Sequence, residues 1–555
     1  MRIDYVYIEE FKNLKKVRID LDESQMNTVL LGQNATGKSN FLEALILIFK
    51  HLDLEEDPPK GLRYKIEYQI QEKKISVDFS TGKYIFHVFS KNNVNGKELW
   101  LSNSKSMSKA EFFTQKKSFL PHYIFTYYSG LSDRLDKLFW KHQQKFYSQI
   151  IKKDFDKTKL DDLRRLFYVK QTHSFFVLLA FFALRNIEKK TSDFLLDTLG
   201  IEDLESVLFI LKKPSWTGKG DERFWGAEGL VQEFLSELWN FSLAPIYYPQ
   251  TIYPDFRSKG VKQEELYLYI TGKEKLHQFS DKYFKGLNIE PNNTDLFKAL
   301  ESTYISELLD EVRVRVRKKV DGEVIFKELS EGEQQLLTVI GLLIFTREKE
   351  SLILLDEPDT HLNPIWKYDY LHFLRKYVKS QNVGDGNTDI EEEDKTTQII
   401  INTHDPLVIG SMDKSQVRIF QKDIETGHTI VIEPDISPKG LGVAGILTSE
   451  LFGLPTILDK ETQEKLNKKR YLQGRLMREN LNEQEYNEYH ILKAELEKYG
   501  FYDEVEDQWF KMYLAEMSKH ELMQKVEFTE KEKAFLQEES KKAVERVLEK
   551  LSPKS

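Results

Sequence analysis

The sequence predicts an α/β fold that is interrupted by a mainly helical insertion and followed by a helical C-terminal region. Short runs of alternating apolar and polar residues, typical of strands, fill residues 1–104. Strand–helix–strand patterns return at 312–455, whereas 105–311 and 456–555 have mostly helical patterns. A chain of 555 residues is longer than one hydrophobic core usually supports, so we expect more than one lobe.

Individual runs predict particular elements in each region. YVYIEE and KKISVDF predict strands near the N-terminus, and SNFLEALILIFKHL predicts a helix. SLILLDEP and QIIINTH predict buried strands on either side of an amphipathic helix, PIWKYDYLHFLRKYVK. The insertion contains the apolar run FFVLLAFFAL at 175–184, which is about half of the ~20 residues that span a bilayer. We therefore expect a buried helix there and no membrane association.

The composition excludes several classes of catalytic site and limits how the protein could contact nucleic acid. The formal net charge of -9 gives no overall positive field, so contacts with nucleic acid would have to come from local basic patches. The absence of cysteine excludes disulfides, thiol catalysis and Cys-ligated zinc, and it fits a reducing cytoplasm. The N-terminal residues MRIDYVYIEEFKNLKK lack the apolar core of a signal peptide, which also favours a cytoplasmic protein.

A glycine-rich motif near the N-terminus predicts a phosphate-binding loop. GQNATGKS matches G-x-x-x-x-G-K-[ST], follows the apolar run TVLL and opens a predicted helix. Backbone N–H groups of such a loop surround the β-phosphate, Lys38 would reach the β- and γ-phosphates, and Ser39 would ligate Mg²⁺. The nucleotide contacts expected from this loop and the start of its helix are Gly32, Gln33, Asn34, Ala35, Thr36, Gly37, Lys38, Ser39 and Asn40.

Two carboxylates follow a buried strand in LILLDEPD. A strand that delivers Asp356 and Glu357 to its end is costly unless a cation or a reaction is present there. Asp356 would hold Mg²⁺, directly or through water, and Glu357 would position and deprotonate an attacking water. By themselves these residues could also form a structural cap, an alternative that the phosphate loop makes less favourable.

Three further motifs surround these carboxylates. In ELSEGEQQLL, Ser330 and Glu333 have the spacing of a capping box, so one alternative is a well-capped helix and nothing more. Asp359 lies in PDTHLNP, and His404 ends the strand IIINTHD. A histidine after a strand is usually structural. Here it ends a third strand of the set that carries the loop and the carboxylates, so we favour a γ-phosphate sensor.

The order of these motifs resembles the ABC-type ATPase heads of the SMC and RecF class. In that class two heads enclose two ATP molecules, so the resemblance implies an ATP-bound homodimer, or a higher oligomer. It implies that Ser330, Gly332 and Glu333 form the signature that contacts the opposing nucleotide, and that Asp359 lies at the interface. The opening IEEFKNLKKVRIDL also resembles the class and would place Lys12 and Asn13 near the base or ribose.

Two departures from the wider ABC pattern are visible. Glu331-Gly332-Glu333 stands where transporters usually carry Gly-Gly-Gln, which argues against a transporter subunit. FTYYSGLSDRL, at 125–135, occupies the region of the Q-loop but contains no glutamine, so the sequence does not position a Q-loop.

A narrower resemblance covers most of the chain. The compact insertion, YYSGLSDRL and GVAGILTSELFGLPTILDKETQEKL (442–466) resemble the PtuA family, the ATPases of Septu antiphage systems, which also occur beside some bacterial retrons. The resemblance implies a separate HNH nuclease of the PtuB type as partner. In a retron setting it implies a reverse transcriptase and its RNA–DNA hybrid. Residues 456–555 would then make partner or oligomer contacts. The alternative is a stand-alone RecF-like or SMC-like DNA-repair ATPase.

The sequence predicts no nuclease site in this chain. A TOPRIM nuclease needs a strand-ending Glu followed by Asp-x-Asp, and no Asp-x-Asp occurs after His404. Glu433 and Asp435 lack the later partner, and the missing cysteines exclude a zinc-braced HNH site.

One basic segment is a candidate for nucleic-acid contact. In VRVRVRKKVDGEVIF, a strand would place its basic residues on one face and valines on the other, with Asp321-Gly322 closing a hairpin. The alternative is the solvent face of a two-sided sheet. The basic residues are Arg313, Arg315, Arg317 and Lys319.

Overall fold

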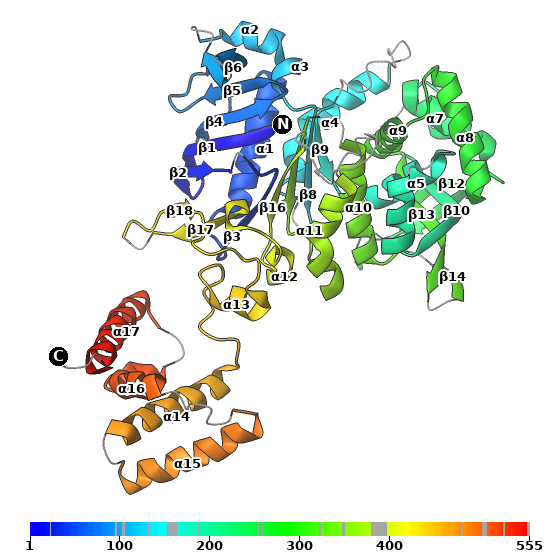
Figure 1. Ribbon diagram of the computed structural model, residues 1–555. Coiled ribbons are helices and arrows are strands. Elements are labelled where there is room, and N and C mark those ends of the chain that lie inside the picture. Colours follow the sequence, from blue (N-terminus) through cyan, green and yellow to red (C-terminus); the bar gives the residue numbers. More distant parts are fainter. Residues whose placement is uncertain are drawn as a thin grey trace, which may run out of the picture. The chain divides into compact units, whose positions relative to one another are not determined.

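The chain forms two compact units, Met1–Leu441 and Gly442–Ser555 (Figure 1). The computed structural model describes all 555 residues except 23, 95–96, 103–105, 131–132, 153–163, 187–188, 217, 254, 258, 321–322, 328, 347–349, 379–396, 424, 479–480, 502–507, 526–527 and 552–555.

An antiparallel six-stranded sheet opens the first unit, as the alternating pattern predicts. In β4 every second side chain is buried, because one face of the sheet packs on the core and the other faces outward. The strand order is β2 (Leu14–Asp20), β1 (Arg2–Phe11), β4 (Arg63–Ile70), β5 (Lys73–Asp78), β6 (Ile85–Val94) and β7 (Lys97–Ser102).

A seven-stranded sheet forms the centre of the first unit. All neighbouring strands are parallel except β17 and β18, which are antiparallel. Every residue of β15 and β16 is buried, which confirms the two buried strands predicted from their apolar runs. The order is β18 (Thr429–Ile432), β17 (Val417–Lys422), β3 (Asn27–Gly32), β16 (Thr397–Asn402), β15 (Ser351–Asp356), β8 (Tyr123–Tyr128) and β9 (Leu166–Val169).

Helix α1 (Lys38–Leu54) joins these two sheets into one core. Its residues are buried on nearly all sides, and Phe41 and Leu45 belong to the same apolar cluster as Ile66 of β4 and Leu354 of β15. Figure 1 shows α1 running beside the strands of both sheets. The strand, loop and helix around the phosphate motif thus confirm the predicted α/β fold.

A third, antiparallel sheet was predicted only in part, because the sequence indicated the hairpin at 312–326 but not the other strands. Residues 105–311, expected to be mainly helical, supply β8 to β12 in addition to their helices. In β10 (Ile201–Lys212), apolar residues recur at helical spacing, as in Ile201, Leu204 and Leu208, so the pattern favours a helix although the chain pairs as a strand. The order is β11 (Ile246–Ile252), β12 (Val261–Thr271), β10, β13 (Leu309–Val320) and β14 (Glu323–Lys327).

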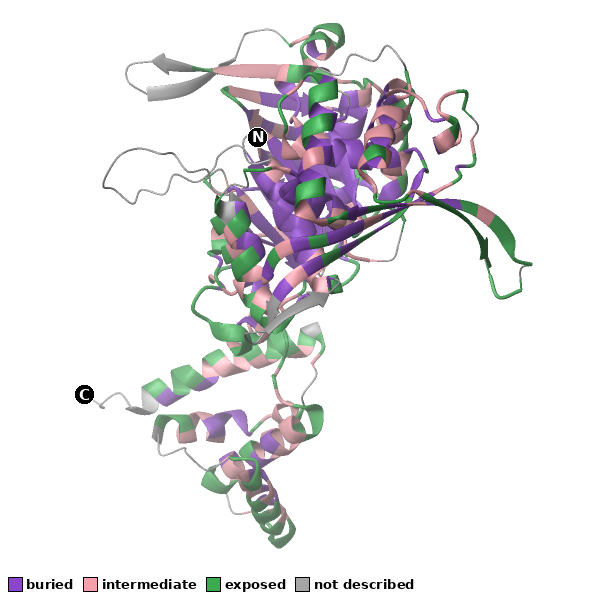
Figure 2. Cartoon of the chain, turned by 90° about the vertical axis from the view of Figure 1, so that its right-hand side faces the viewer, coloured by how far each residue is buried: buried purple, intermediate pink, exposed green. Residues whose placement is uncertain are grey.

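The edge of this sheet formed by β11 is exposed. All seven residues of β11 are exposed, and Tyr248 is 57% and Phe256 93% exposed. Figure 2 shows the exposed β11–β12 ribbon beside the largely buried sheets of the same unit.

Helices complete the first unit. Helix α5 (His173–Ala183) is almost wholly buried, which confirms the helix expected from the apolar run. Among the described residues, no helix combines the length and apolar character that crossing a membrane needs. The other helices are α2 (Lys109–Thr114), α3 (Lys116–Phe119), α4 (Asp136–Ile150), α6 (Lys189–Asp193), α7 (Gly229–Phe241), α8 (Gly272–Leu287), α9 (Asn293–Ile305), α10 (Glu331–Thr346), α11 (Pro364–Val378) and α12 (Pro406–Ile409), with short turns η2 (Phe194–Thr198), η3 (Glu222–Phe224) and η4 (Lys414–Gln416).

The described part of the second unit is helical, as predicted. Leu472, Tyr489 and Leu492 form a small buried cluster between α14 and α15. Helix α16 packs against both α14 and α17. The elements are α13 (Gly442–Thr448), α14 (Lys460–Arg478), α15 (Glu483–Lys498), α16 (Gln508–Met517), the turn η5 (Glu521–Gln524) and α17 (Glu530–Leu551).

Candidate active site

The carboxyl ends of four parallel strands meet at one edge of the central sheet. Asp356, at the end of β15, pairs in register with Asn402 of β16 and with Tyr128 of β8. Asn402 in turn pairs with Leu30 of β3, two residues before the phosphate loop begins. Segments that lie more than 300 residues apart in the sequence therefore present their polar ends at one place, where ligands of open α/β sheets bind.

Backbone conformation shapes the loop between β3 and α1. Gly32 and Gly37 have φ of 137° and 108°, and a Cβ at Gly32 would lie 2.1 Å from the carbonyl oxygen of Phe420. Ala35 also has a positive φ, 64°, and Thr36 Oγ1 donates to the Gln33 carbonyl at 2.8 Å. Gly32 is thus required by its conformation and by its close approach to β17, and Gly37 by its conformation. Both allow backbone N–H groups to surround an anion.

Lys38 is the cation of this loop. Its side chain is buried, and its Nζ donates to the carbonyls of Gly32 at 2.7 Å and Gln33 at 3.1 Å. Burial lowers its pKa to about 8, against the opposing effect of the Asp356 and Glu357 carboxylates. A buried amine of this kind is stabilised in its charged form by a neighbouring polyanion such as a triphosphate.

Ser39 and Asp356 form a candidate magnesium site. Ser39 Oγ donates to Asp356 Oδ1 at 3.4 Å, and Asn402 Nδ2 donates to the same carboxylate oxygen. Asp356 Oδ2 is buried and has no hydrogen-bond partner among the described residues, and burial raises the pKa of this carboxyl. A hydroxyl beside a carboxylate with one free oxygen fits the oxygen ligands that Mg²⁺ prefers.

Glu357 and His404 lie together beside this pair. Glu357 has a left-handed backbone, φ 53°, and its N–H donates to the Asn402 carbonyl at 2.8 Å. His404 Nε2 lies 3.5 Å from Glu357 Oε1, and both side chains are 41% exposed. Burial, followed by the Lys38 charge, lowers the pKa of His404, which favours the neutral imidazole near pH 7. Strained backbone at Glu357 is typical of residues that a site holds in place.

Asp359 connects the segment after β15 with the end of β16. Its Oδ2 accepts a hydrogen bond from Thr403 Oγ1 at 3.1 Å, and the residue is only 5% exposed. Burial raises the pKa of Asp359 to about 6.

The start of α10 is fixed by a capping box, as its sequence predicts. Ser330 N–H donates to Glu333 Oε2 at 2.8 Å, and Glu333 N–H donates to Ser330 Oγ at 3.4 Å. The buried Lys318 amine donates to Glu333 Oε1. A Cβ at Gly332 would lie 2.7 Å from the His361 carbonyl oxygen, so the helix start is close to the segment that carries Asp359.

Asn13 contacts the phosphate loop directly, whereas Lys12 contacts α1. Asn13 Nδ2 donates to the Ala35 carbonyl at 3.1 Å, and Asn40 Nδ2 donates to Asn13 Oδ1 at 2.7 Å. Lys12 Nζ lies 2.6 Å from Glu43 Oε2, which also lies 3.4 Å from Arg134 Nε.

The basic stripe of β13 is partly neutralised by acidic neighbours. Side chains alternate between exposed and buried at 312–316, as the sequence predicts. Arg313 Nε lies 2.8 Å from Glu311, and Arg317 lies 3.5 Å from Glu202 and from Asp203. Arg315 is exposed. The Lys319 side chain and the Asp321-Gly322 turn lie outside the described residues.

Sequence reasoning missed Asn402. Its amide orients the Asp356 carboxylate and lies 3.4 Å from Ser39 Oγ, so it joins the two candidate metal ligands. The available signal was its place at the end of QIIINTH, two residues before His404 and on a strand that pairs with β15. Ser129, in the glutamine-free FTYYSGLSDRL segment, also lies at this edge, because its N–H donates to the Asp356 carbonyl at 3.3 Å. Residues 131–132 of that segment lie outside the described part.

Comparison with known proteins agrees with this geometry. The family model described as AAA ATPase domain matches residues 1–409. A stretch of 188 residues is 27% identical to the Septu protein PtuA of Bacillus mycoides (strain KBAB4), covering 31% of this chain and 23% of that protein. The alignment therefore spans less than a quarter of that relative.

Solved structures of Smc heads are also similar to this chain. One is an Smc head bound to the C-terminal winged-helix domain of ScpA (13% identity, 78% of this chain and 97% of that one, TM-score 0.30). Another is the Smc head of Pyrococcus furiosus with an extended coiled coil, bound to the C-terminal domain of ScpA (14% identity, 78% and 96%, TM-score 0.30).

Proposed function

Because the chain belongs to the AAA ATPase domain family and is an ATPase, we propose that it is the ATP-hydrolysing subunit of a bacterial antiphage defence complex of the Septu type. In this proposal, ATP-dependent pairing of two heads regulates a separate HNH nuclease of the PtuB type. The partial likeness to a Septu PtuA protein supports the defence role. The absence of cysteine supports a cytoplasmic location.

The observation that carries the proposal is the single sheet edge where the loop, both carboxylates and His404 meet. Lys38 would bind the β- and γ-phosphates, and Ser39 and Asp356, oriented by Asn402, would hold Mg²⁺. Mg²⁺, when bound, neutralises charge on the phosphates.

Glu357 is the proposed general base. It would take a proton from water as the water oxygen bonds to the γ-phosphorus and the bond to the β–γ bridging oxygen breaks. The left-handed backbone and the hydrogen bond from its N–H to Asn402 hold Glu357 beside Asp356. A neutral His404, 3.5 Å from Glu357, could donate a hydrogen bond from its ring N–H to the γ-phosphate.

Pairing of two heads would use the exposed start of α10. Ser330 is exposed and held by the capping box, so it is available to contact a nucleotide on a second copy. Asp359 would lie at the same interface. Residues 456–555 would contact the nuclease or further copies. In a retron setting, the reverse transcriptase and its RNA–DNA hybrid would join the complex.

Two substitutions in the purified chain test the proposal. Lys38→Ala should abolish ATP binding, whereas Glu357→Gln should keep ATP bound and lower its hydrolysis about 10²–10⁴-fold, because only the base is lost. Glu72→Gln, at an exposed turn between β4 and β5, is the matched control and should behave as wild type. Radiolabelled ATP binding and phosphate release measure both quantities.

The defence role is tested in cells that carry the chain with its neighbouring genes. Both variants should lose protection in phage plating assays while Glu72→Gln retains it. Native hydrolysis by Glu357→Gln would show that the base lies elsewhere. Full protection by Glu357→Gln would show that ATP turnover is not required, and full protection by Lys38→Ala would show that defence does not need ATP binding by this chain. No protection by the wild-type genes would refute the defence role and favour a stand-alone repair ATPase.

A further inference from the structure

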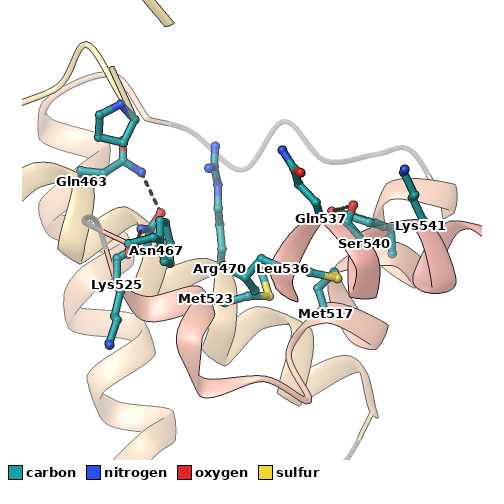
Figure 3. A pocket seen from close by; sticks show the side chains of 13 residues that line it. Gln463, Asn467, Arg470, Met517, Met523, Lys525, Leu536, Gln537, Ser540 and Lys541 are labelled. Carbon is teal, nitrogen blue, oxygen red and sulfur yellow. Dashed lines mark hydrogen bonds between the residues drawn. The ribbon is translucent and has the colours of Figure 1, made fainter. Parts of the chain in front are cut away.

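The second unit contains a pocket of about 780 Å³ that is separate from the nucleotide motifs. This volume lies within the range of ordinary ligand-binding pockets. The pocket is formed by α14, α16, α17 and the turn η5. Figure 3 shows its side chains, with Arg470 standing between the helices.

Cations and soft apolar groups are combined in this pocket. Met517, Met523 and Leu536 contribute apolar surface, and Arg470, Lys525 and Lys541 contribute positive charge. Methionine side chains are flexible and polarizable, so they adapt to varied apolar groups and are common at peptide-binding surfaces.

Within the described part of the second unit, no acidic partner offsets the charge of Arg470. Lys525 Nζ is paired with Glu532 at 2.7 Å, whereas no ion pair joins Arg470 or Lys541 to a described carboxylate. Burial alone lowers the pKa of Arg470, with no acidic group acting in the other direction. Arg470 is exposed, so its guanidinium is accessible to a carboxylate, with which it can form paired hydrogen bonds.

The chemistry of the pocket favours a peptide over a nucleotide or a nucleic acid. Arg470 and Lys541 lie well inside helices α14 and α17, so neither cation belongs to a helix N-terminus, where phosphate commonly binds. Residues 442–555 carry 23 acidic and 19 basic side chains, a balance that repels a long polyanion. A short peptide segment with a few carboxylates and apolar side chains could pair with the cations of the pocket and pack on its apolar side chains.

We propose that this pocket binds an acidic amphipathic segment of a partner protein. A glutamate or aspartate of that segment pairs with Arg470, a second pairs with Lys541, and an apolar side chain packs on Met517, Met523 and Leu536. This inference deepens the proposed function by naming the chemistry of the partner contact, and it rests on that function only for the existence of a partner.

The experiment uses the full chain and fluorescein-labelled helical peptides of one design. Each peptide carries leucines on one face and either glutamates or lysines on the other, and anisotropy measures its binding. The glutamate peptide should bind and the lysine peptide should not. Arg470→Glu and Lys541→Glu should each weaken glutamate-peptide binding at least tenfold. Lys531→Glu, an exposed charge reversal on α17 outside the pocket lining, is the control and should not.

Two further measurements distinguish a failure of the pocket inference from a failure of the proposed function. ATP hydrolysis should be unchanged in all three variants, because the nucleotide residues belong to the other unit. The product of the neighbouring nuclease gene should no longer co-purify with Arg470→Glu. Equal binding of both peptides, or unchanged glutamate-peptide binding in both pocket variants, would overturn the inference. Displacement of the peptide by ATP or a short oligonucleotide would overturn it as well.

Discussion

At the scale of single residues, Asp359 gives the site a pH-dependent stability. Its pKa rises from an ordinary 3.8 to about 6 because the carboxyl is buried. The folded state therefore binds more protons than the unfolded state between these values, and the contribution of Asp359 to stability falls as pH rises through about 4 to 6.

Asp359→Asn should remove the loss of stability that accompanies ionisation of Asp359 as pH rises. The amide keeps the shape of the side chain and can still accept the hydrogen bond from Thr403. Between pH 5 and 7.5 the variant should gain about 1 kcal/mol relative to wild type. Thermal unfolding at both pH values measures the difference. Asp197→Asn, at an exposed position, is the control. An identical pH dependence of wild type and Asp359→Asn would show that the carboxyl titrates normally.

At the scale of elements, the start of α10 should control pairing of two heads. Ser330→Arg places bulk and charge where the proposed contact with a second nucleotide occurs. In the Glu357→Gln background, ATP should convert the chain to a dimer in size-exclusion chromatography, and Ser330→Arg should prevent this. Ser330→Thr keeps the hydroxyl that caps the helix and should still dimerise. ATP-dependent dimers of the arginine variant would place the interface elsewhere.

The basic stripe of β13 is a second element-scale case. Acidic neighbours of Arg313 and Arg317 offset much of its charge, which leaves exposed Arg315 as the strongest candidate for phosphate contact. Reversing all three arginines to glutamate should weaken nucleic-acid binding and flatten its salt dependence, because fewer counterions are released. ATP binding should remain. Equal binding by wild type and the triple variant across a salt titration would identify the stripe as a solvated sheet face.

At the scale of the whole molecule, we expect no nuclease activity from the chain alone. The described residues contain no group of three or more His, Cys, Asp or Glu side chains that could hold a metal ion. Purified protein with Mg²⁺ or Mn²⁺ should leave DNA and RNA intact in gel assays over hours. Cleavage that persists in Glu357→Gln after further purification would reveal a nuclease site in this chain.

The arrangement of the sheets was predictable from the sequence only in part. The phosphate loop, Asp356 and His404 each lie at or just after the end of an apolar strand. Parallel strands bring such ends together, so this part of the site could be predicted. The third sheet could be predicted only at its β13–β14 hairpin, because β10 carries apolar residues at helical spacing and becomes a strand only through pairing with β12 and β13. The ion pair of Lys318 with Glu333 depends on that same sheet.

The strand order of the central sheet also has a consequence for the time at which the protein can fold during its synthesis. β3 begins at Asn27, and its neighbour β16 begins at Thr397, 370 residues later. At ~5–20 residues per second, a ribosome needs roughly 20–70 s to reach β16 after making β3. Throughout that interval β3 and the phosphate loop that follows it lack β16 and β17, the two strands that flank β3 in the sheet. A nascent chain that stops before residue 397 therefore carries the complete GQNATGKS motif without a site in which it can act.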